Sequence, residues 1–341
     1  MFIIRPIVES DYPALMQIAD ESGIGFTSLP TNEQLLRSRI AHSETSFASK
    51  ATKPGNEGYL LVMEDTETGD VVGTTGIESA VGLDNAFYHY HLGKVVHSSQ
   101  ELKLHNTIET LTLCNDYTGA AELCTLFLRL QSRGGNNGRV LSRVRFLMLA
   151  EFNERFGDKV IAEMRGVSNE HGESPFWQWL EEHFFSMDFP TADYLSGIGN
   201  KVFIAELMPR FPIYVNLLSK AAQKVIGHVH DKTKPALSLL EREGFRYRGY
   251  VDIFDGGPTV ECELNQIKAV KDSIRLKVEI CDSVKNTSTA FVACNTNFEN
   301  FRATEIYIDM NSDVNVAFIT REHADALDVN NGDMIRILEL S

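Results

Sequence analysis

The chain has 341 residues, of which 43% are apolar. This is enough to bury a large core, which excludes a disordered chain or a miniprotein. Lys and Arg number 32 against 47 Asp and Glu, and the net charge of −15 argues against nucleic acid or an anionic membrane as the main partner. A small cationic substrate suits this charge better.

The location and redox state also follow from the composition. No apolar run is long enough to span a bilayer, and residues 1–12 lack the segments of a signal peptide. We therefore expect a cytoplasmic protein. The five cysteines are odd in number and widely spaced, with no C-x-x-C pair, so we expect reduced thiols rather than disulfides or a zinc site.

The N-terminal third predicts strands around one helix. Residues 2–6 predict a short strand, and Ser10 or Asp11 can cap the helix that follows. Residues 58–82 predict a β-hairpin with an acidic, glycine-containing tip. Alternating segments within residues 87–114 predict further antiparallel strands.

A strand–helix–strand unit follows. Residues 121–130 are almost continuously apolar, as expected for a strand covered on both faces. A loop rich in glycine and asparagine leads into a helix with one apolar stripe, and residues 159–167 predict the next strand. Such units place ligands at the carboxyl ends of their strands.

The rest of the chain divides into three parts. Residues 168–234 are irregular and rich in aromatic side chains, which we expect to pack together. Residues 236–254 predict a helix ended by Gly244 and then a strand. From residue 265 short β runs predict a separate small module.

The loop Arg133–Gly138 is a candidate anion site, because backbone N–H groups at a helix N-terminus attract phosphate. Between Leu123 and Ala150 there are five arginines and no Asp, Glu or Lys. Arginine binds phosphate through two parallel hydrogen bonds. The alternative is a solvated basic helix face. The absence of G-K-[ST] and G-x-G-x-x-G disfavours nucleotide hydrolysis and a dinucleotide site.

This loop, together with residues 3–15 and 236–250, resembles the GCN5-related N-acetyltransferase fold. The pyrophosphate loop of those enzymes reads [RQ]-x-x-G-x-[GA], and Asn136 replaces its middle glycine here. Asparagine tolerates left-handed backbone better than most residues. The resemblance implies an α/β fold with a mixed sheet flanked by helices. It also implies an acyltransferase domain over residues 1–264, with the insertion at about 168–234, and a β-rich module over 265–341.

Longer blocks resemble the arginine N-succinyltransferase family across most of the chain. These blocks are residues 1–16, 27–30, 80–93, 122–128, 162–189, 203–209, 225–230 and 241–262. The resemblance implies transfer of a succinyl group from succinyl-CoA to the α-amine of L-arginine, giving CoA and N2-succinyl-L-arginine in arginine catabolism. Succinyl-CoA is then a co-substrate, and no metal or permanently bound cofactor is expected.

The resemblance also implies site residues. The succinyl-CoA contact of the family falls on Leu126, and its proton donor falls on His230, with His228 two positions away. A histidine can exchange protons near neutral pH, as aminolysis of a thioester requires. Without the resemblance, a core leucine and a solvated imidazole would be the simpler interpretations. The CoA contacts expected at the loop are Arg133, Asn136, Gly138 and Arg139.

Direct attack by the amine is favoured over an acyl-enzyme, since Cys124 lies in an apolar strand without a neighbouring base. Arg165 is a candidate for binding the succinyl carboxylate. Carboxylates of the middle segment are candidates for binding the guanidinium of arginine. They are Glu163, Glu170, Glu173, Asp188 and Asp193.

Several alternatives remain open at this stage. A related acyl-CoA transferase could use ornithine or lysine, and a CoA-binding sensor without turnover would tolerate Asn136 in the loop. We expect a homo-oligomer, such as a dimer, while a paired paralogous subunit is the alternative assembly. Neither nucleic acid nor membrane is an expected partner.

Overall fold

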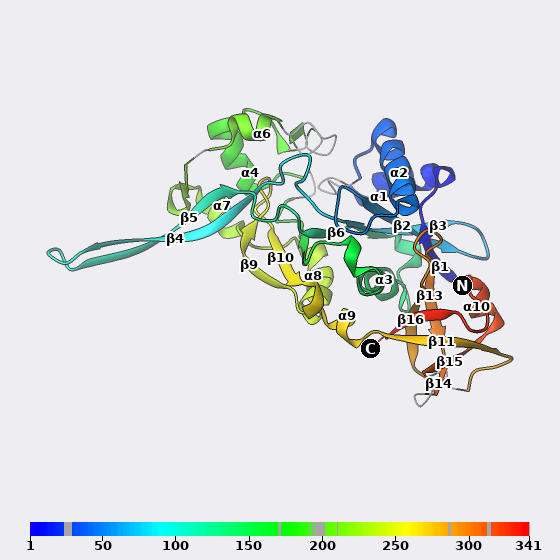
Figure 1. Ribbon diagram of the computed structural model, residues 1–341. Coiled ribbons are helices and arrows are strands. Elements are labelled where there is room, and N and C mark those ends of the chain that lie inside the picture. Colours follow the sequence, from blue (N-terminus) through cyan, green and yellow to red (C-terminus); the bar gives the residue numbers. More distant parts are fainter. Residues whose placement is uncertain are drawn as a thin grey trace.

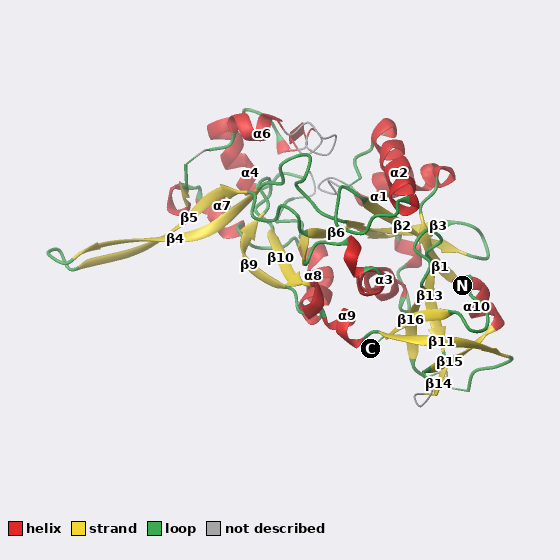
Figure 2. Ribbon diagram, in the orientation of Figure 1, coloured by secondary structure: helices red, strands yellow, loops and turns green. Residues whose placement is uncertain are grey.

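The computed structural model describes residues 1–23, 29–169, 172–189, 191–192, 195, 202–209, 211–285, 288–311 and 315–340. Within these ranges the strands form one mixed sheet of 16 strands flanked by helices (Figures 1 and 2). The mixed α/β class predicted from the sequence is confirmed. No helix in this part of the chain is long and apolar enough to cross a bilayer.

The strands lie in the order β14-β15-β11-β16-β12-β13-β1-β2-β3-β6-β7-β10-β9-β4-β5-β8. In chain order they are β1 (Phe2–Pro6), β2 (Gly58–Asp65), β3 (Val71–Glu78), β4 (His89–Ser99), β5 (Leu104–Cys114), β6 (Ala121–Leu128), β7 (Lys159–Glu163), β8 (Ile213–Tyr214), β9 (Arg246–Val251), β10 (Pro258–Glu263), β11 (Ile274–Cys281), β12 (Ala290–Asn295), β13 (Ala303–Tyr307), β14 (Asp309–Asn311), β15 (Val316–Thr320) and β16 (Met334–Glu339). The α-helices are α1 (Tyr12–Ser22), α2 (Glu33–Ala48), α3 (Asn137–Glu151), α4 (Pro175–Leu180), α6 (Val202–Leu207), α7 (Lys220–Val225), α8 (Lys234–Arg242), α9 (Lys268–Asp272) and α10 (Arg321–Leu327).

Alternation along β2 builds a core on each face of the sheet. Leu60 and Val62 face α1 and α2, whereas Leu61 and Met63 face α3. Burial of apolar side chains on both faces explains why the central strands contain few charged residues.

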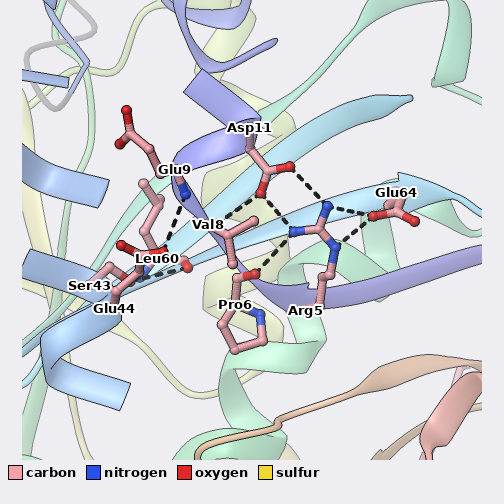
Figure 3. Close-up of polar contacts among 9 residues, drawn as sticks. All are labelled: Arg5, Pro6, Val8, Glu9, Asp11, Ser43, Glu44, Leu60 and Glu64. Carbon is pink, nitrogen blue, oxygen red and sulfur yellow. Dashed lines mark hydrogen bonds and ion pairs between the residues drawn. The ribbon is translucent and has the colours of Figure 1, made fainter. Parts of the chain in front are cut away.

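The first strand and helix are joined by a partly buried ion-pair cluster (Figure 3). The Arg5 guanidinium binds Asp11 at 2.7 Å and Glu64 at 2.5 Å. Asp11 precedes α1, as predicted for a cap, but its carboxylate accepts the Val8 N–H instead of an N–H of the helix.

The aromatic segment between β7 and α8 forms a core of its own. Trp177 is 1% exposed and packs against Phe185, Phe189 and Phe254. This confirms the prediction that these aromatic residues serve packing. Beside them, β4 and β5 pair along their full lengths and project from the body as a two-stranded arm (Figure 1).

The C-terminal strands have their own apolar core but continue the main sheet. Leu276, Val278 and Ile306 belong to a cluster enclosed by strands β11 to β16 and α10. The sheet is nevertheless unbroken, because β13 pairs with β1. Buried Glu151 at the end of α3 adds a second connection, binding Arg275 at 2.5 Å and Arg336 at 2.8 Å.

Candidate functional site

The strands β6 and β7 separate after a short parallel pairing. They pair at Ala121 with Val160 and at Glu122 with Ile161, and their described residues form no further pair. Beyond Glu122, the backbones diverge toward their carboxyl ends. A cavity of about 540 Å³, which we call the strand-gap cavity, opens between the diverging ends.

An irregularity in β6 shapes this gap. The pairing of β6 with β3 shifts register between Thr74 and Gly76, and Thr125 adopts a positive φ of 55°. A β-branched residue in this region is strained, so surrounding contacts must hold it. One such contact is the hydrogen bond from the Thr74 hydroxyl to the Thr125 carbonyl, at 2.9 Å.

The strand-gap cavity brings together residues that are distant in sequence. Half-buried Leu126 lines it from β6, and Met164 and Arg165 line it from β7 and the residues just after it. Arg133 lines it from the loop before α3, and Lys232 lines it from the segment before α8. Leu126 and Arg133, which the sequence analysis assigned to one ligand, therefore border one cavity.

The loop before α3 leaves its backbone accessible. Gly135 has a φ of +52°, and a Cβ built on Gly134, Gly135 or Gly138 would meet no heavy atom within 4 Å. Within the described part of the chain, the N–H groups of Gly135 and Asn136 form no hydrogen bond. An anion can therefore approach these N–H groups at the start of α3. The Asn136 side chain is directed elsewhere, since its Nδ2 donates to Glu305 of β13 at 2.9 Å.

The five arginines of this segment divide into two groups. Arg129 pairs with Glu21, Arg143 donates to the Glu339 carbonyl at 2.6 Å, and Arg145 is 3% exposed. Burial lowers the pKa of Arg145 to about 10. Arg133 and Arg139 are the two that remain exposed beside the loop. The Nε of Arg133 donates to the Leu128 carbonyl at 2.8 Å, which fixes its guanidinium group near the cavity.

His230 lies beside the end of β7. Its backbone N–H donates to the Arg165 carbonyl at 2.9 Å, and its Nδ1 accepts the Lys232 N–H at 3.1 Å. Partial burial and the positive charges of Arg165 and Lys232 lower the pKa of His230. The neutral imidazole is thus the prevailing form at pH 7. His228 is exposed, and its Nδ1 lies 3.0 Å from the Ile226 carbonyl.

A second cavity of about 450 Å³ adjoins the first. Glu122, Cys124 and Glu163 line both cavities, because alternation along the paired strands places these three side chains on one face. We call the second cavity the acidic cavity. Its carboxylate residues are Glu78, Asp84, Glu122, Glu163 and Asp252.

Basic residues balance the acidic cavity only in part. Arg39 and His42 also line it, and Arg39 pairs with Glu78 at 3.2 Å. The surplus of carboxylates suits a cationic ligand. The thiol of Cys124 has a raised pKa because it is desolvated and lies near Glu78 and Glu122.

The carboxylates that the sequence analysis proposed for binding guanidinium do not all lie at one site. Glu163 lines the acidic cavity, whereas Glu173 hydrogen-bonds with Asn169 and Asp188 accepts the Thr191 N–H, and neither lines either cavity. Glu170 and Asp193 lie outside the described residues. Sequence reasoning missed Glu78, which ends β3, Glu122 of β6, and Asp252, which directly follows β9.

Comparisons with known proteins indicate the same family for both the N-terminal and the C-terminal part of the chain. A family model for the arginine N-succinyltransferase beta subunit matches residues 2–269, and a model for the C-terminal domain of that subunit matches residues 274–339. The arginine N-succinyltransferases of Escherichia coli K12 and Escherichia coli O17:K52:H18 are each 47% identical over 340 residues, covering 100% of this chain and 98% of theirs. The solved arginine/ornithine succinyltransferase subunit AI from Pseudomonas aeruginosa is 34% identical, with a TM-score of 0.91, and the match covers 100% of this chain and 99% of that one.

Proposed function

Because the chain belongs to the arginine N-succinyltransferase family, we propose that it transfers the succinyl group of succinyl-CoA to the α-amine of L-arginine. The products are CoA and N2-succinyl-L-arginine. The observation that carries the proposal is the meeting of two cavities where β6 and β7 separate. The strand-gap cavity reaches the exposed basic loop at Arg133, and the acidic cavity is lined by carboxylates, so an anionic acyl donor and a cationic acceptor each have a matching cavity.

Succinyl-CoA occupies the strand-gap cavity in this proposal. The diphosphate binds the N–H groups at the start of α3, beside Arg133 and Arg139, where Gly138 leaves room for close approach. The pantetheine chain follows β6 past Leu126, where the described residues of β7 no longer pair with β6. Asn136 contributes its backbone N–H, since its side chain is bound to Glu305. Arg165 is the cation proposed for the succinyl carboxylate.

L-arginine occupies the acidic cavity. Glu78 and Asp84 line the acidic cavity but not the strand-gap cavity, so they are the carboxylates proposed for the guanidinium group. Glu122 and Glu163 lie where the two cavities meet, so they are proposed for the α-ammonium end. This orientation brings the α-amine, rather than the side chain, to the thioester.

The reaction proceeds by direct attack in a ternary complex. The amine nitrogen forms a bond to the thioester carbonyl carbon, and the C–S bond then breaks. Neutral His230 takes up the proton that the nitrogen loses after attack and passes it to the departing thiolate. The Cys124 thiol, whose pKa is raised, takes no covalent part.

The decisive experiment measures thiol release from the purified chain. Succinyl-CoA and acetyl-CoA are each tested with arginine, ornithine, lysine and a polyamine. Fast release with succinyl-CoA and arginine supports the proposal, with N2-succinyl-L-arginine identified by mass spectrometry. Saturable CoA binding without release from any pair would favour a sensor and contradict it.

Ornithine is the second candidate acceptor, because the solved relative from Pseudomonas aeruginosa is named an arginine/ornithine succinyltransferase. Ornithine is shorter and carries an ammonium instead of a guanidinium group. A kcat/KM for ornithine equal to that for arginine would mean that Glu78 and Asp84 do not select the guanidinium.

We further propose that the chain acts in the cytoplasm as a homo-oligomer, with a paired paralogous subunit as the alternative. Light scattering on the purified chain measures the assembly, and thiol release from the same sample shows whether a second subunit is needed. Inactivity that is restored only by a paralogous chain would favour the alternative.

A further inference from the structure

We propose that Glu163, held by the buried imidazole of His89, is the catalytic base that removes a proton from the α-ammonium group of the acceptor. This inference rests on the proposed function, because it assigns a step within that reaction. It gives Glu163 a role different from guanidinium binding, and it separates two proton transfers that His230 alone would otherwise have to perform.

The position of Glu163 is the first argument. It is the last residue of β7, two positions beyond the final residue of that strand paired with β6. Its side chain lines both the strand-gap cavity and the acidic cavity and remains 27% exposed. A ligand that extends from one cavity into the other therefore has this carboxylate in its lining.

The support behind Glu163 is the second argument. The Nε2 of His89 lies 2.9 Å from the Glu163 Oε1, and His89 is 0% exposed. The rings of Phe87 and Tyr117 enclose the imidazole, with centroids at 5.0 and 4.9 Å. The buried imidazole therefore lies within ion-pair distance of one carboxylate oxygen of a side chain that lines both cavities.

The charged neighbours of Glu163 come from three elements. Glu122 and Cys124 on β6 line the same junction, Asp252 lies just after β9, and Arg165 follows two residues along the chain. Glu163 itself pairs with the buried imidazole of His89.

The proton balance of the step is complete. The α-ammonium gives one proton to the Glu163 carboxylate, which becomes a carboxylic acid, and the neutral amine keeps its electron pair for attack. The second proton leaves the nitrogen after the C–N bond forms, and it reaches the CoA sulfur through His230 as the C–S bond breaks. Glu163 returns its proton to solvent after the product leaves.

The test is Glu163→Gln in the full chain, assayed with succinyl-CoA and arginine between pH 6.5 and 9.5. We expect kcat/KM for arginine to fall by about 10² to 10⁴ at pH 7, the range for removal of an acid–base group. The difference in kcat/KM between wild type and variant shrinks about tenfold for each unit of pH, up to the pKa of the arginine α-amine. The reason is that the variant can use only arginine whose α-amine is already neutral in solution. Succinyl-CoA binding and the melting temperature stay unchanged.

A less basic acceptor gives an independent readout. L-argininamide has a less basic α-amine than arginine, so Glu163→Gln loses less activity with it at pH 7. Glu122→Gln is the matched control, since Glu122 lines the same two cavities from the neighbouring strand β6. We expect it to raise KM for arginine while keeping the pH profile of the wild type. For His89→Gln, whose folding is checked by its melting temperature, we expect a smaller loss of kcat/KM than for Glu163→Gln, with the same dependence on pH.

Two results would overturn the inference. One is a Glu163→Gln enzyme with the pH profile of the wild type. The other is a loss that is equal for arginine and argininamide at every pH, which would indicate binding or structure. If the wild-type chain transfers succinyl to no amine at all, the proposed function fails instead, so the two failures are distinguishable.

Discussion

The carboxylate of Asp255 accepts the backbone N–H of Gly166 at 2.6 Å and that of Gly257 at 2.8 Å. Gly166 in turn forms a β-bridge with Val229, the residue before His230. A buried carboxylate after β9 therefore fixes the segment that carries the imidazole, although it does not touch that ring. Asp255 is in this sense a positioning residue.

We expect Asp255→Asn to weaken both stability and turnover. Its amide can accept only one of the two N–H groups, and the unsatisfied one costs about 1–3 kcal/mol of unfolding free energy. The kcat falls because His230 shifts, while CoA affinity stays unchanged. Urea unfolding and steady-state kinetics measure the two effects, and a destabilised variant with a wild-type kcat would remove the positioning role.

The same substitution has a signature in the pH dependence of stability. Burial and the neighbouring Asp252 raise the pKa of Asp255 above its value in the unfolded chain. Ionisation of this group therefore lowers the unfolding free energy as pH rises from about 3.9 through the raised pKa. We expect Asp255→Asn to lack this decline in urea titrations between pH 4 and pH 8.

Replacement of His230 by alanine tests the proton transfer to the thiolate. We expect kcat to fall by about 10² to 10⁴ with little change in succinyl-CoA affinity. Because burial and the charges of Arg165 and Lys232 lower the pKa of His230, wild-type kcat/KM declines only as pH falls below about 6.5, when the imidazole becomes protonated. The variant lacks that decline. His228→Ala is the control, and an equal defect there would contradict the assignment.

Substitution of Arg133 and Arg139 together by glutamine tests the diphosphate site. We expect the Kd for CoA, measured by calorimetry, to rise at least tenfold, since two exposed guanidinium groups beside the loop are lost. Dephosphorylated pantetheine derivatives are unaffected. Arg321→Gln on α10 is the control, because Arg321 lines neither cavity. Unchanged CoA affinity in the double variant would disprove the site.

Cys124→Ala separates direct attack from an acyl-enzyme. The thiol lines both cavities, yet burial raises its pKa, so little thiolate exists near pH 7. We expect kcat within a few-fold of the wild type and no mass increase of the protein after incubation with succinyl-CoA alone. A succinylated wild-type protein that disappears in the variant would reverse this view.

Local signals predicted much of the fold. The apolar run of β6, the loop, the stripe on α3 and the strand β7 lie where the pattern placed them, and α8 ends beside Gly244, whose φ is +106°. The helix α2 was not predicted, because its sequence has only a weak apolar periodicity. The pairing of β13 with β1 was not predicted either, since no local pattern encodes a contact between chain ends.

The residues of the candidate site were harder to predict from the sequence than the fold. Leu126 and His230 came from family resemblance, whereas the basic loop of Arg133 stood out by its own pattern. Leu126 and Arg133 line one cavity, and His230 lies beside the end of β7. The acidic cavity arises only when the ends of β3 and β9 meet β6 and β7, so Glu78 and Asp252 carried no recognisable signal. The pairing of His89 with Glu163 likewise joins two strands that are distant in sequence.

The place of β1 between β2 and β13 has a consequence for biosynthesis. The Thr304 hydroxyl donates to the Phe2 carbonyl across 302 positions of sequence, so the ribosome makes the first strand of the sheet long before its second neighbour. Until then one edge of β1 carries unpaired N–H and C=O groups, which are prone to pair with other chains. Completion of the sheet must await nearly the entire polypeptide, and nascent chains that stall before β13 are the ones most exposed to aggregation.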